Sequence, residues 1–296
     1  MKYQFYTCDV FTTDRFGGNP LAVLPHADGL SSEQMQQIAR EFNYSESTFV
    51  LPSDDHTRQV RIFTPTQEVP FAGHPNIGTA FTLASTGELG DVDGEITITF
   101  AEKAGLVPIA IRPTDKGIWC ELKAPETLTL GQSFDLELIA RALSLSASDI
   151  VTDTHQPQLA SVGLPFIMVE LKDQDALERA RAYVPALEEI HAQGIMPDVL
   201  VYVRSEGEVD IRARVFAPLD GVPEDPATGS ANCALTAMLT HYHADTTGDY
   251  RWHIAQGVEM KRPSLLEART EKRDGAITGV WIAGHCQMVI EGYIYI

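Results

Sequence analysis

The chain has 296 residues and a formal net charge of −19, from 22 Lys and Arg against 41 Asp and Glu. Such an excess of negative charge repels a polyanion, so we expect no nucleic-acid partner. With 44% hydrophobic and 21% charged residues the composition is globular, and the length suffices for two cores of ordinary domain size. No apolar run approaches the ~20 residues of a membrane span, so we expect no membrane partner.

Four cysteines stand at positions 8, 120, 233 and 286. They form no CxxC pair and no Cys/His cluster, so we expect neither a disulfide framework nor a metal site. The N-terminal segment MKYQFYTCDVFT alternates like a strand and has no signal-peptide core. We therefore expect a cytoplasmic protein whose thiols stay reduced.

The first half begins with a strand over 2–11, and a helix is expected over about 31–42. Ser31 is its expected N-cap, because Gln34 completes a capping box and apolar residues then recur with helical spacing. A second helix over 76–86 is apolar on nearly every side, which indicates burial, and Gly87 is its expected C-cap. Further strands are expected at 21–24, 47–52, 58–63, 95–100, 106–112 and 117–122.

The second half follows the same plan. Helices are expected over about 135–144 and over 174–193, where Pro185 begins a second piece. A nearly all-apolar helix is expected over about 229–242. Strands are expected at 158–162, 166–171, 198–204, 209–216, 251–256, 264–270, 276–283 and 286–295.

Two segments half a chain apart are nearly the same. Residues 61–70 read RIFTPTQEVP and residues 214–223 read RVFAPLDGVP, so Arg, Phe, Pro, Val and Pro recur at the same offsets. Each copy leads into a Pro-containing helix start, at 74–80 and at 225–231. Repeated blocks in the same order indicate a duplicated domain, and a cleft between two domains is the usual place for small-molecule chemistry.

We therefore predict an α+β fold of two pseudo-equivalent domains, each a curled mixed β-sheet wrapped around a central apolar helix. The predicted domains are 1–123 and 124–285, with the strand at about 286–296 returning to the first. The active site is expected in the cleft between them.

Three titratable residues are candidates for acid–base chemistry. Glu46 starts a strand among hydroxyl side chains, where a carboxylate could reach a cleft; an exposed charge at a strand end is the alternative. The second half has only Val199 at the matching place. His74 lies at a helix N-terminus, whose dipole favours a neutral ring, and capping of that helix is its alternative role. Asp225 is expected at the equivalent helix start, either as an acid–base partner or as a structural N-cap.

The two helix starts themselves suit a substrate carboxylate, because their backbone N–H groups are free and the helix dipole is positive there. The expected substrate-binding residues are Gly73, Asn76, Gly229 and Ser230. Close packing is the alternative reason for these glycines. Neither segment matches GxGxxG or GxxxxGK[ST], so no nucleotide is expected.

Taken together, these motifs resemble the PhzF-like family, the phenazine-biosynthesis isomerase and its relatives. The resemblance covers essentially the whole chain and is carried by DVF at 9–11 with GNP at 18–20, SESTF at 45–49, FAGHPNIGT at 71–79 and EDPATGSA at 224–231. It implies the diaminopimelate-epimerase-like fold, and no metal, nucleotide or organic cofactor. It also implies that Glu46 moves a proton between substrate carbons, and that His74, Asp225 and Ser230 line the site.

The related epimerases and proline racemases use two opposed thiols, which this chain lacks at both helix starts. We therefore predict a cofactor-independent isomerase that moves a proton between carbons of a small carboxylate-bearing substrate through Glu46. One alternative is an epimerase or racemase of a small amino or hydroxy acid that uses Glu46 with His74 or Asp225. Another is a non-catalytic ligand-binding member of the same fold. The one protein partner that we consider is a second copy of the chain, in a homodimer.

Overall fold

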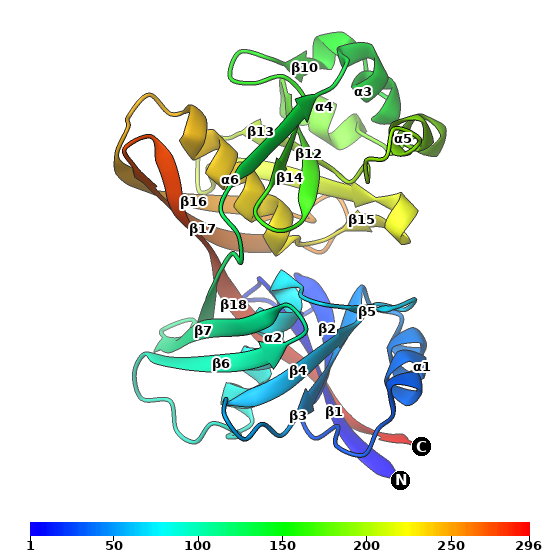
Figure 1. Cartoon of the computed structure of the whole chain (residues 1–296), viewed down its shortest axis with the longest axis vertical. Helices are drawn as coiled ribbons and strands as arrows, with labels where there is room; N and C mark the ends of the chain where they lie inside the picture. Colours follow the sequence, from blue (N-terminus) through cyan, green and yellow to red (C-terminus); the bar gives the residue numbers. More distant parts are fainter. The chain divides into compact units, whose positions relative to one another are not determined.

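The computed structural model describes all 296 residues. The chain divides into two compact units: unit 1 comprises Met1–Lys123 with Ile282–Ile296, and unit 2 comprises Ala124–Trp281 (Figure 1). Both units contain parallel and antiparallel strand pairs with few helices, so the fold is mixed and rich in sheet, as predicted.

Unit 1 is a mixed sheet with two helices. Its strands are β1 (Lys2–Val10), β2 (Asn19–Leu24), β3 (Glu46–Leu51), β4 (Arg58–Phe63), β5 (Glu68–Val69), β6 (Ile96–Glu102), β7 (Gly105–Thr114), β8 (Gly117–Lys123) and the C-terminal part of β18 (Ala276–Tyr295). Its helices are α1 (Ser32–Phe42) and α2 (Gly73–Ser85). Strand β2 is parallel to β3, β3 is antiparallel to β4, and β4 is parallel to β6.

Unit 2 repeats this order of pairings, since β12 is parallel to β13, β13 antiparallel to β14, and β14 parallel to β16. Its strands are β9 (Thr129–Ser133), β10 (Ile150–Val151), β11 (Gln158–Ser161), β12 (Pro165–Leu171), β13 (Val199–Arg204), β14 (Ile211–Ala217), β15 (Val222–Asp225), β16 (Gly248–Gln256) and β17 (Ser264–Arg273). Its helices are α3 (Leu136–Ala142), α4 (Gln174–Arg179), α5 (Val184–His191) and α6 (Gly229–Tyr242), with short 3₁₀ turns η1 (Ala147–Asp149) and η2 (Pro218–Asp220).

Helices α2 and α6 are the buried helices of the two units. Nearly every residue of each is inaccessible to solvent, because a helix that is apolar on all sides must be covered on all sides. In unit 1, α2 packs against β1, β2, β3, β7 and β8; in unit 2, α6 packs against β11, β12, β16 and β17 (Figure 1). The predicted helix over 229–242 is confirmed, and the one predicted over 76–86 begins three residues earlier, at Gly73.

The other predicted helices are confirmed with small changes. In α1, the Gln34 N–H donates to Ser31 Oγ at 3.2 Å and the Ser31 N–H donates to Gln34 Oε1 at 2.9 Å, which is the predicted capping box. The helical pattern over 174–193 is split into α4 and α5, with Pro185 in the first turn of α5. Gly87 follows the C-cap of α2 instead of forming it, at φ 78°.

The strands also differ in places from the prediction. The two strands predicted over 276–283 and 286–295 form one strand, β18. The strands β5, β9, β10 and β15 were not predicted; β5 and β10 have two residues each, which is too few for a readable alternation.

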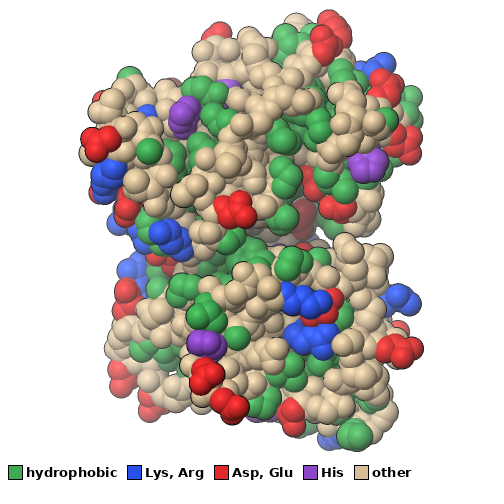
Figure 2. Space-filling model, in the orientation of Figure 1, with side chains coloured by type: hydrophobic (Ala, Val, Ile, Leu, Met, Phe, Trp, Pro, Cys, Tyr) green, Lys and Arg blue, Asp and Glu red, His purple; other side chains and the backbone are tan.

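The face of the molecule seen in Figure 2 carries no single concentration of acidic side chains. Acidic side chains are spread over the visible face among polar and basic ones (Figure 2). No helix of the chain combines the length and the apolar character needed to cross a membrane.

Gly78 tests the close packing of α2 on unit 1. A Cβ at this position would lie 2.6 Å from Leu21 Cδ2 and 2.7 Å from Val10 Cγ2. We expect Gly78→Ala to lower the free energy of unfolding by about 1–3 kcal/mol through overpacking, although Ala favours a helix by about 1 kcal/mol. Urea denaturation measures this. Gly94→Ala, where a Cβ meets nothing within 4 Å, is the control. A Gly78→Ala variant as stable as the wild type would contradict the packing argument.

Candidate active site

Unit 1 brings Glu46 and His74 together. Glu46 is the first residue of β3 and is paired with Leu21 of β2, while His74 is the second residue of α2. His74 Nε2 lies 3.5 Å from Glu46 Oε2, and the side chains are 6% and 19% exposed, respectively. The carboxylate therefore lies beside a helix N-terminus and remains partly accessible to a small molecule.

A polar chain orients the His74 ring. Ser45 Oγ donates to Asn19 Oδ1 at 3.1 Å, and Asn19 Nδ2 lies 3.4 Å from His74 Nδ1. Because an amide nitrogen only donates, His74 Nδ1 is the acceptor, and the neutral ring carries its hydrogen on Nε2. That hydrogen is on the side of the ring nearest the Glu46 carboxylate. The sequence analysis placed Asn19 in a turn motif and missed this role, which only the fold reveals.

The His74 ring is neutral near pH 7. Burial lowers the pKa of His74 from 6.5 to about 3, because the interior penalises an imidazolium. The N-terminal end of α2 acts in the same direction. The approach of His74 to Glu46 is thus that of an N–H group to a carboxyl group.

Asp225 does not occupy the place of His74 in unit 2, so that expectation is wrong. Helix α6 begins at Gly229 after the N-cap Thr228, and Asp225 is the last residue of β15. Unit 2 has three more residues than unit 1 between the repeated Val-Pro and the helix. As the second residue of α6, Ser230 is the counterpart of His74, and Asp225 is not the N-cap.

Asp225 is nevertheless held next to the beginning of α6. Its Oδ2 accepts a hydrogen bond from Thr228 Oγ1, and its carbonyl accepts one from Gln256 Nε2 at 2.7 Å. Asp225 is buried, whereas Ser230 is partly exposed. The role of Gln256, at the end of β16, was missed because nothing in the sequence links it to a helix 24 residues earlier.

The first residues of the two buried helices, here called the α2 start (72–76) and the α6 start (228–232), lack the usual side-chain caps. Neither N-cap, Ala72 or Thr228, caps its helix through a side chain. An uncapped start leaves N–H groups available to another acceptor, and an anion fits there. Gly73 and Gly229 are the first helical residues, so the predicted substrate-binding glycines do lie at these starts.

Asn76 belongs to the same structure but faces inward. It is fully buried, and its Nδ2 donates to the Ala72 carbonyl at 3.0 Å. Asn232 makes the corresponding bond to Thr228 at 2.9 Å. A contact shared by both helices indicates that the Asn76 amide braces the α2 start.

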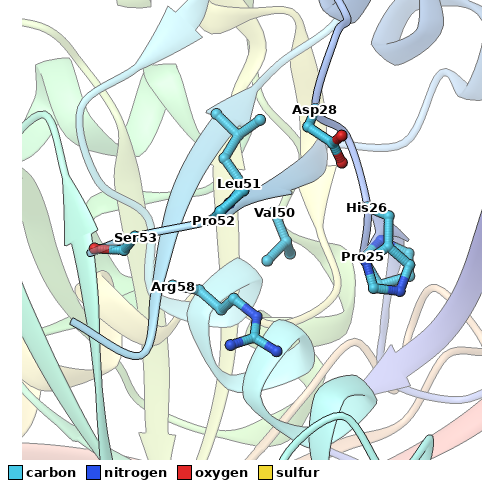
Figure 3. A pocket seen from close by; sticks show the side chains of 8 residues that line it. All are labelled: Pro25, His26, Asp28, Val50, Leu51, Pro52, Ser53 and Arg58. Carbon is cyan, nitrogen blue, oxygen red and sulfur yellow. The ribbon is translucent and has the colours of Figure 1, made fainter. Parts of the chain in front are cut away.

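A pocket of about 230 Å³ lies elsewhere in unit 1 (Figure 3). It is at the far end of β3 from Glu46, about 16 Å away for five strand residues. Its basic side chains already have a partner, since His26 and Arg58 lie 2.9 Å and 3.5 Å from Glu88. The pocket is therefore separate from the Glu46–His74 pair. It is lined by Pro25, His26, Asp28, Val50, Leu51, Pro52, Ser53 and Arg58.

The cysteines are not placed or charged for nucleophilic chemistry. All four are free and buried. Burial raises the pKa of Cys8 to about 12 and also raises the pKa of Cys120, Cys233 and Cys286 above the ordinary range of a thiol. Since the thiolate is the reactive form, these thiols are inert near neutral pH. No group of three or more His, Cys, Asp or Glu side chains is arranged to hold a metal ion.

Comparison with known proteins gives consistent matches along the chain. The family model described as phenazine biosynthesis-like protein (PhzC-PhzF) matches residues 8–292. An uncharacterized isomerase of Mesorhizobium japonicum is 37% identical over 305 residues, covering 100% of this chain and 99% of the relative. The trans-2,3-dihydro-3-hydroxyanthranilate isomerase of Pseudomonas aeruginosa is 35% identical, covering 99% of this chain and 100% of that enzyme.

A solved structure supports the fold. The phenazine biosynthesis protein of the PhzF family from Bacillus anthracis superposes with a TM-score of 0.91, and the match covers 100% of both chains at 24% identity. Agreement at that level over the full length confirms the mixed, sheet-rich fold of this chain.

The first prediction from the site concerns the thiols. We expect iodoacetamide to leave all four cysteines unmodified in the native protein near pH 7, because burial keeps them protonated and inaccessible. Intact-mass spectrometry measures the labelling, and the protein in denaturant serves as the fully labelled control. Rapid labelling of the native chain at any cysteine would show a reactive thiol.

The second prediction concerns the burial of His74. Unfolded His74 binds a proton below about pH 6.5, whereas the folded ring stays neutral down to about pH 3. The unfolded state thus binds more protons, and acidification through this window destabilises the fold. We expect His74→Asn, which keeps an acceptor for Asn19, to lack this dependence. Relative to this variant, the unfolding constant of the wild type should rise by up to about tenfold per pH unit as the pH falls from about 6.5 to 5. Parallel urea denaturation profiles for the two proteins would contradict a buried neutral ring.

Proposed function

The chain belongs to the phenazine biosynthesis-like PhzF family, whose curated relatives are isomerases, and we propose that it moves a proton between carbons of a small carboxylate-bearing substrate. In this proposal no cofactor takes part, and Glu46 is the general acid–base residue. The observation that carries it is the 3.5 Å approach of His74 Nε2 to the partly exposed Glu46 carboxylate.

The strand pairings correct one expectation, because the residue of unit 2 that matches Glu46 is Asp198 and not Val199. In the repeated segment Phe63 corresponds to Phe216, and their strand partners are Ser47 and Val199. Glu46 precedes Ser47, so its counterpart is Asp198, and both units carry a carboxyl group at this place. Asp198 is buried, and the proposal for Glu46 is supported by the neutral His74 ring beside it and not by a difference at this strand position.

In the proposed mechanism Glu46 transfers the proton and His74 stays neutral. The Glu46 carboxylate removes a proton from an acidic C–H group next to an unsaturated or carbonyl system, and it returns the proton to another carbon of the same substrate. His74, neutral through burial, presents its Nε2 at 3.5 Å from the carboxylate and adds no charge beside it.

The helix starts are proposed to bind the substrate carboxylate. Backbone N–H groups at Gly73 and Gly229 are not capped by the N-cap side chains, and they lie at the positive ends of the helix dipoles. We propose that Ser230 and Asp225 act on the same substrate as Glu46. An aminocarboxylic acid with a ring double bond, as named for the Pseudomonas aeruginosa relative, is the first substrate to test.

Glu46→Gln tests the proposed base. The amide keeps the size and polarity of the carboxylate but cannot take up a proton, so exchange of deuterium from D₂O into the substrate should fall by about 10²–10⁴-fold. The substrate to use first is trans-2,3-dihydro-3-hydroxyanthranilate, followed by other small unsaturated or amino carboxylic acids. Exchange is followed by mass spectrometry. Glu33→Gln, the same change at an exposed position of α1, should leave the rate unchanged.

The result also separates the rival functions. Wild-type exchange rates in Glu46→Gln would leave His74 or Asp225 as the base and remove Glu46 from the mechanism. Loss of optical rotation without migration of a double bond would identify an epimerase instead of an isomerase. Binding of the acid without deuterium exchange would identify a ligand-binding protein.

A further inference from the structure

The duplicated strands place Glu102 and Gln256 at the same point of the two units. In the repeated segment Arg61 of β4 corresponds to Arg214 of β14, so Gln59 corresponds to Arg212. Gln59 is paired with Ala101 of β6, and Arg212 with Ala255 of β16, in parallel pairs of both units. The next residue, and the last of each strand, is Glu102 in unit 1 and Gln256 in unit 2.

Gln256 shows what this position does. It is fully buried, and its Oε1 accepts hydrogen bonds from the Thr228 N–H at 3.1 Å and from Asn232 Nδ2 at 2.7 Å. Its Nε2 donates to the Asp225 carbonyl at 2.7 Å and to Thr228 Oγ1 at 3.1 Å. Gln256 thus braces the α6 start by acting at once as an acceptor and as a donor.

The α2 start is built in the same way. Asn76 and Asn232 are each the fourth residue of their helix, and each donates to the carbonyl of its own N-cap residue. The end of β6 is tied to the segment that leads into α2, since the Ala104 N–H donates to the Pro70 carbonyl at 3.1 Å. The side chain at 102 therefore lies beside the α2 start, near the Asn76 amide, at the position from which Gln256 binds the α6 start.

Glu102 has a carboxyl group at the position where unit 2 has the amide of Gln256. Both of its oxygens are inaccessible to solvent, and neither makes a hydrogen bond within 3.5 Å. The Asn76 amide is near enough to favour the charged form, but the bond it makes goes to the Ala72 carbonyl. Burial is the larger effect and raises the pKa of Glu102 from 4.5 to about 8.

The charged groups near Glu102 do not alter this balance. On its own segment the Lys103 ammonium is bound to Glu68 of β5 at 2.6 Å. On α2, the buried His74 is neutral, since burial lowers its pKa to about 3. Neither a cation nor a second carboxylate contributes to the shift in the pKa of Glu102, so desolvation decides it.

We propose that Glu102 is a neutral carboxylic acid in the folded protein and that it positions the α2 start, as the counterpart of Gln256 in unit 2. Only the protonated form combines an acceptor oxygen with a donor O–H, which is the pair of functions that glutamine supplies. Ionisation would place a buried negative charge beside the α2 start. Its consequence for catalysis rests on the proposed function, because a substrate carboxylate held at the α2 start would then be repelled.

The charge state is tested by the pH dependence of stability, without any substrate. The carboxyl of unfolded Glu102 ionises above about pH 4.5, whereas the folded group keeps its proton up to about pH 8. The folded state then binds one more proton, so stability falls as the pH rises through this window and levels off above it. Relative to Glu102→Gln, the unfolding constant of the wild type should rise by about tenfold per pH unit between these limits.

Gln256→Glu is the matched control, because it places the carboxyl of unit 1 at the equivalent position of unit 2. We expect this variant to lose stability with rising pH more steeply than the wild type, since two buried carboxyl groups must then stay protonated. Urea denaturation of the three proteins between about pH 5 and 9 gives all the slopes. A Glu102→Gln variant with the pH dependence of the wild type would overturn the proposal.

The positioning role is tested by the Michaelis constant for the confirmed substrate. In the wild type KM should rise above about pH 8 while kcat changes less, and in Glu102→Gln this rise should be absent. Glu102→Ala, which has neither donor nor acceptor, should raise KM at all pH values. Equal KM values for the Ala and Gln variants would refute positioning. The stability measurements need no turnover, so failure of the proposed function stays distinguishable from failure of this inference.

Discussion

The structure depends on one constraint: each unit encloses a helix that is apolar on every side, and this helix must begin inside protein. The first N–H groups of a helix have no partner within it, and burial makes an unpaired polar group costly. In neither unit does the N-cap side chain supply an acceptor. The acceptors must come from neighbouring strands or from a bound molecule, and several buried polar side chains lie at the α2 start and the α6 start for this reason.

The two units have different residues at the equivalent positions around the start of the buried helix. The second helical residue is His74 in unit 1 and Ser230 in unit 2, and the bracing strand residue is Glu102 in unit 1 and Gln256 in unit 2. Unit 1 therefore carries titratable groups where unit 2 carries neutral amides and hydroxyls. The Glu46–His74 pair lies in unit 1, and at the helix start it is this unit that carries the titratable ring.

Much of the fold could be predicted from the sequence, because the signals were local. The all-apolar runs gave both buried helices, and the capping box at Ser31 and Gln34 gave the start of α1. The repeat gave the shared order of strands. The repeat gave a wrong expectation for Asp225. Unit 2 has three more residues than unit 1 between the repeated Val-Pro and the buried helix, so Asp225 lies in β15, before the helix begins.

The rest of the site could not be predicted, because its contacts join residues far apart in the chain. Asn19 meets His74 across 55 residues, and Gln256 meets Thr228 across 28. A glutamate at a strand end reads as exposed, so nothing local distinguishes Glu102 from a solvated charge. Desolvation depends on everything packed around a group, and only the three-dimensional structure shows it.

The central claim is that Glu46 is the base and that the substrate is oriented by a helix start. A crystal structure of the Glu46→Gln variant with bound trans-2,3-dihydro-3-hydroxyanthranilate tests this most directly, because the variant should hold the acid without converting it. The account predicts the substrate carboxylate on backbone N–H groups of Gly73 or Gly229, with a ring carbon about 3–3.5 Å from the amide at position 46. Binding of the acid in the pocket beside His26 and Arg58, with the side chain at 46 not in contact with it, would contradict the account.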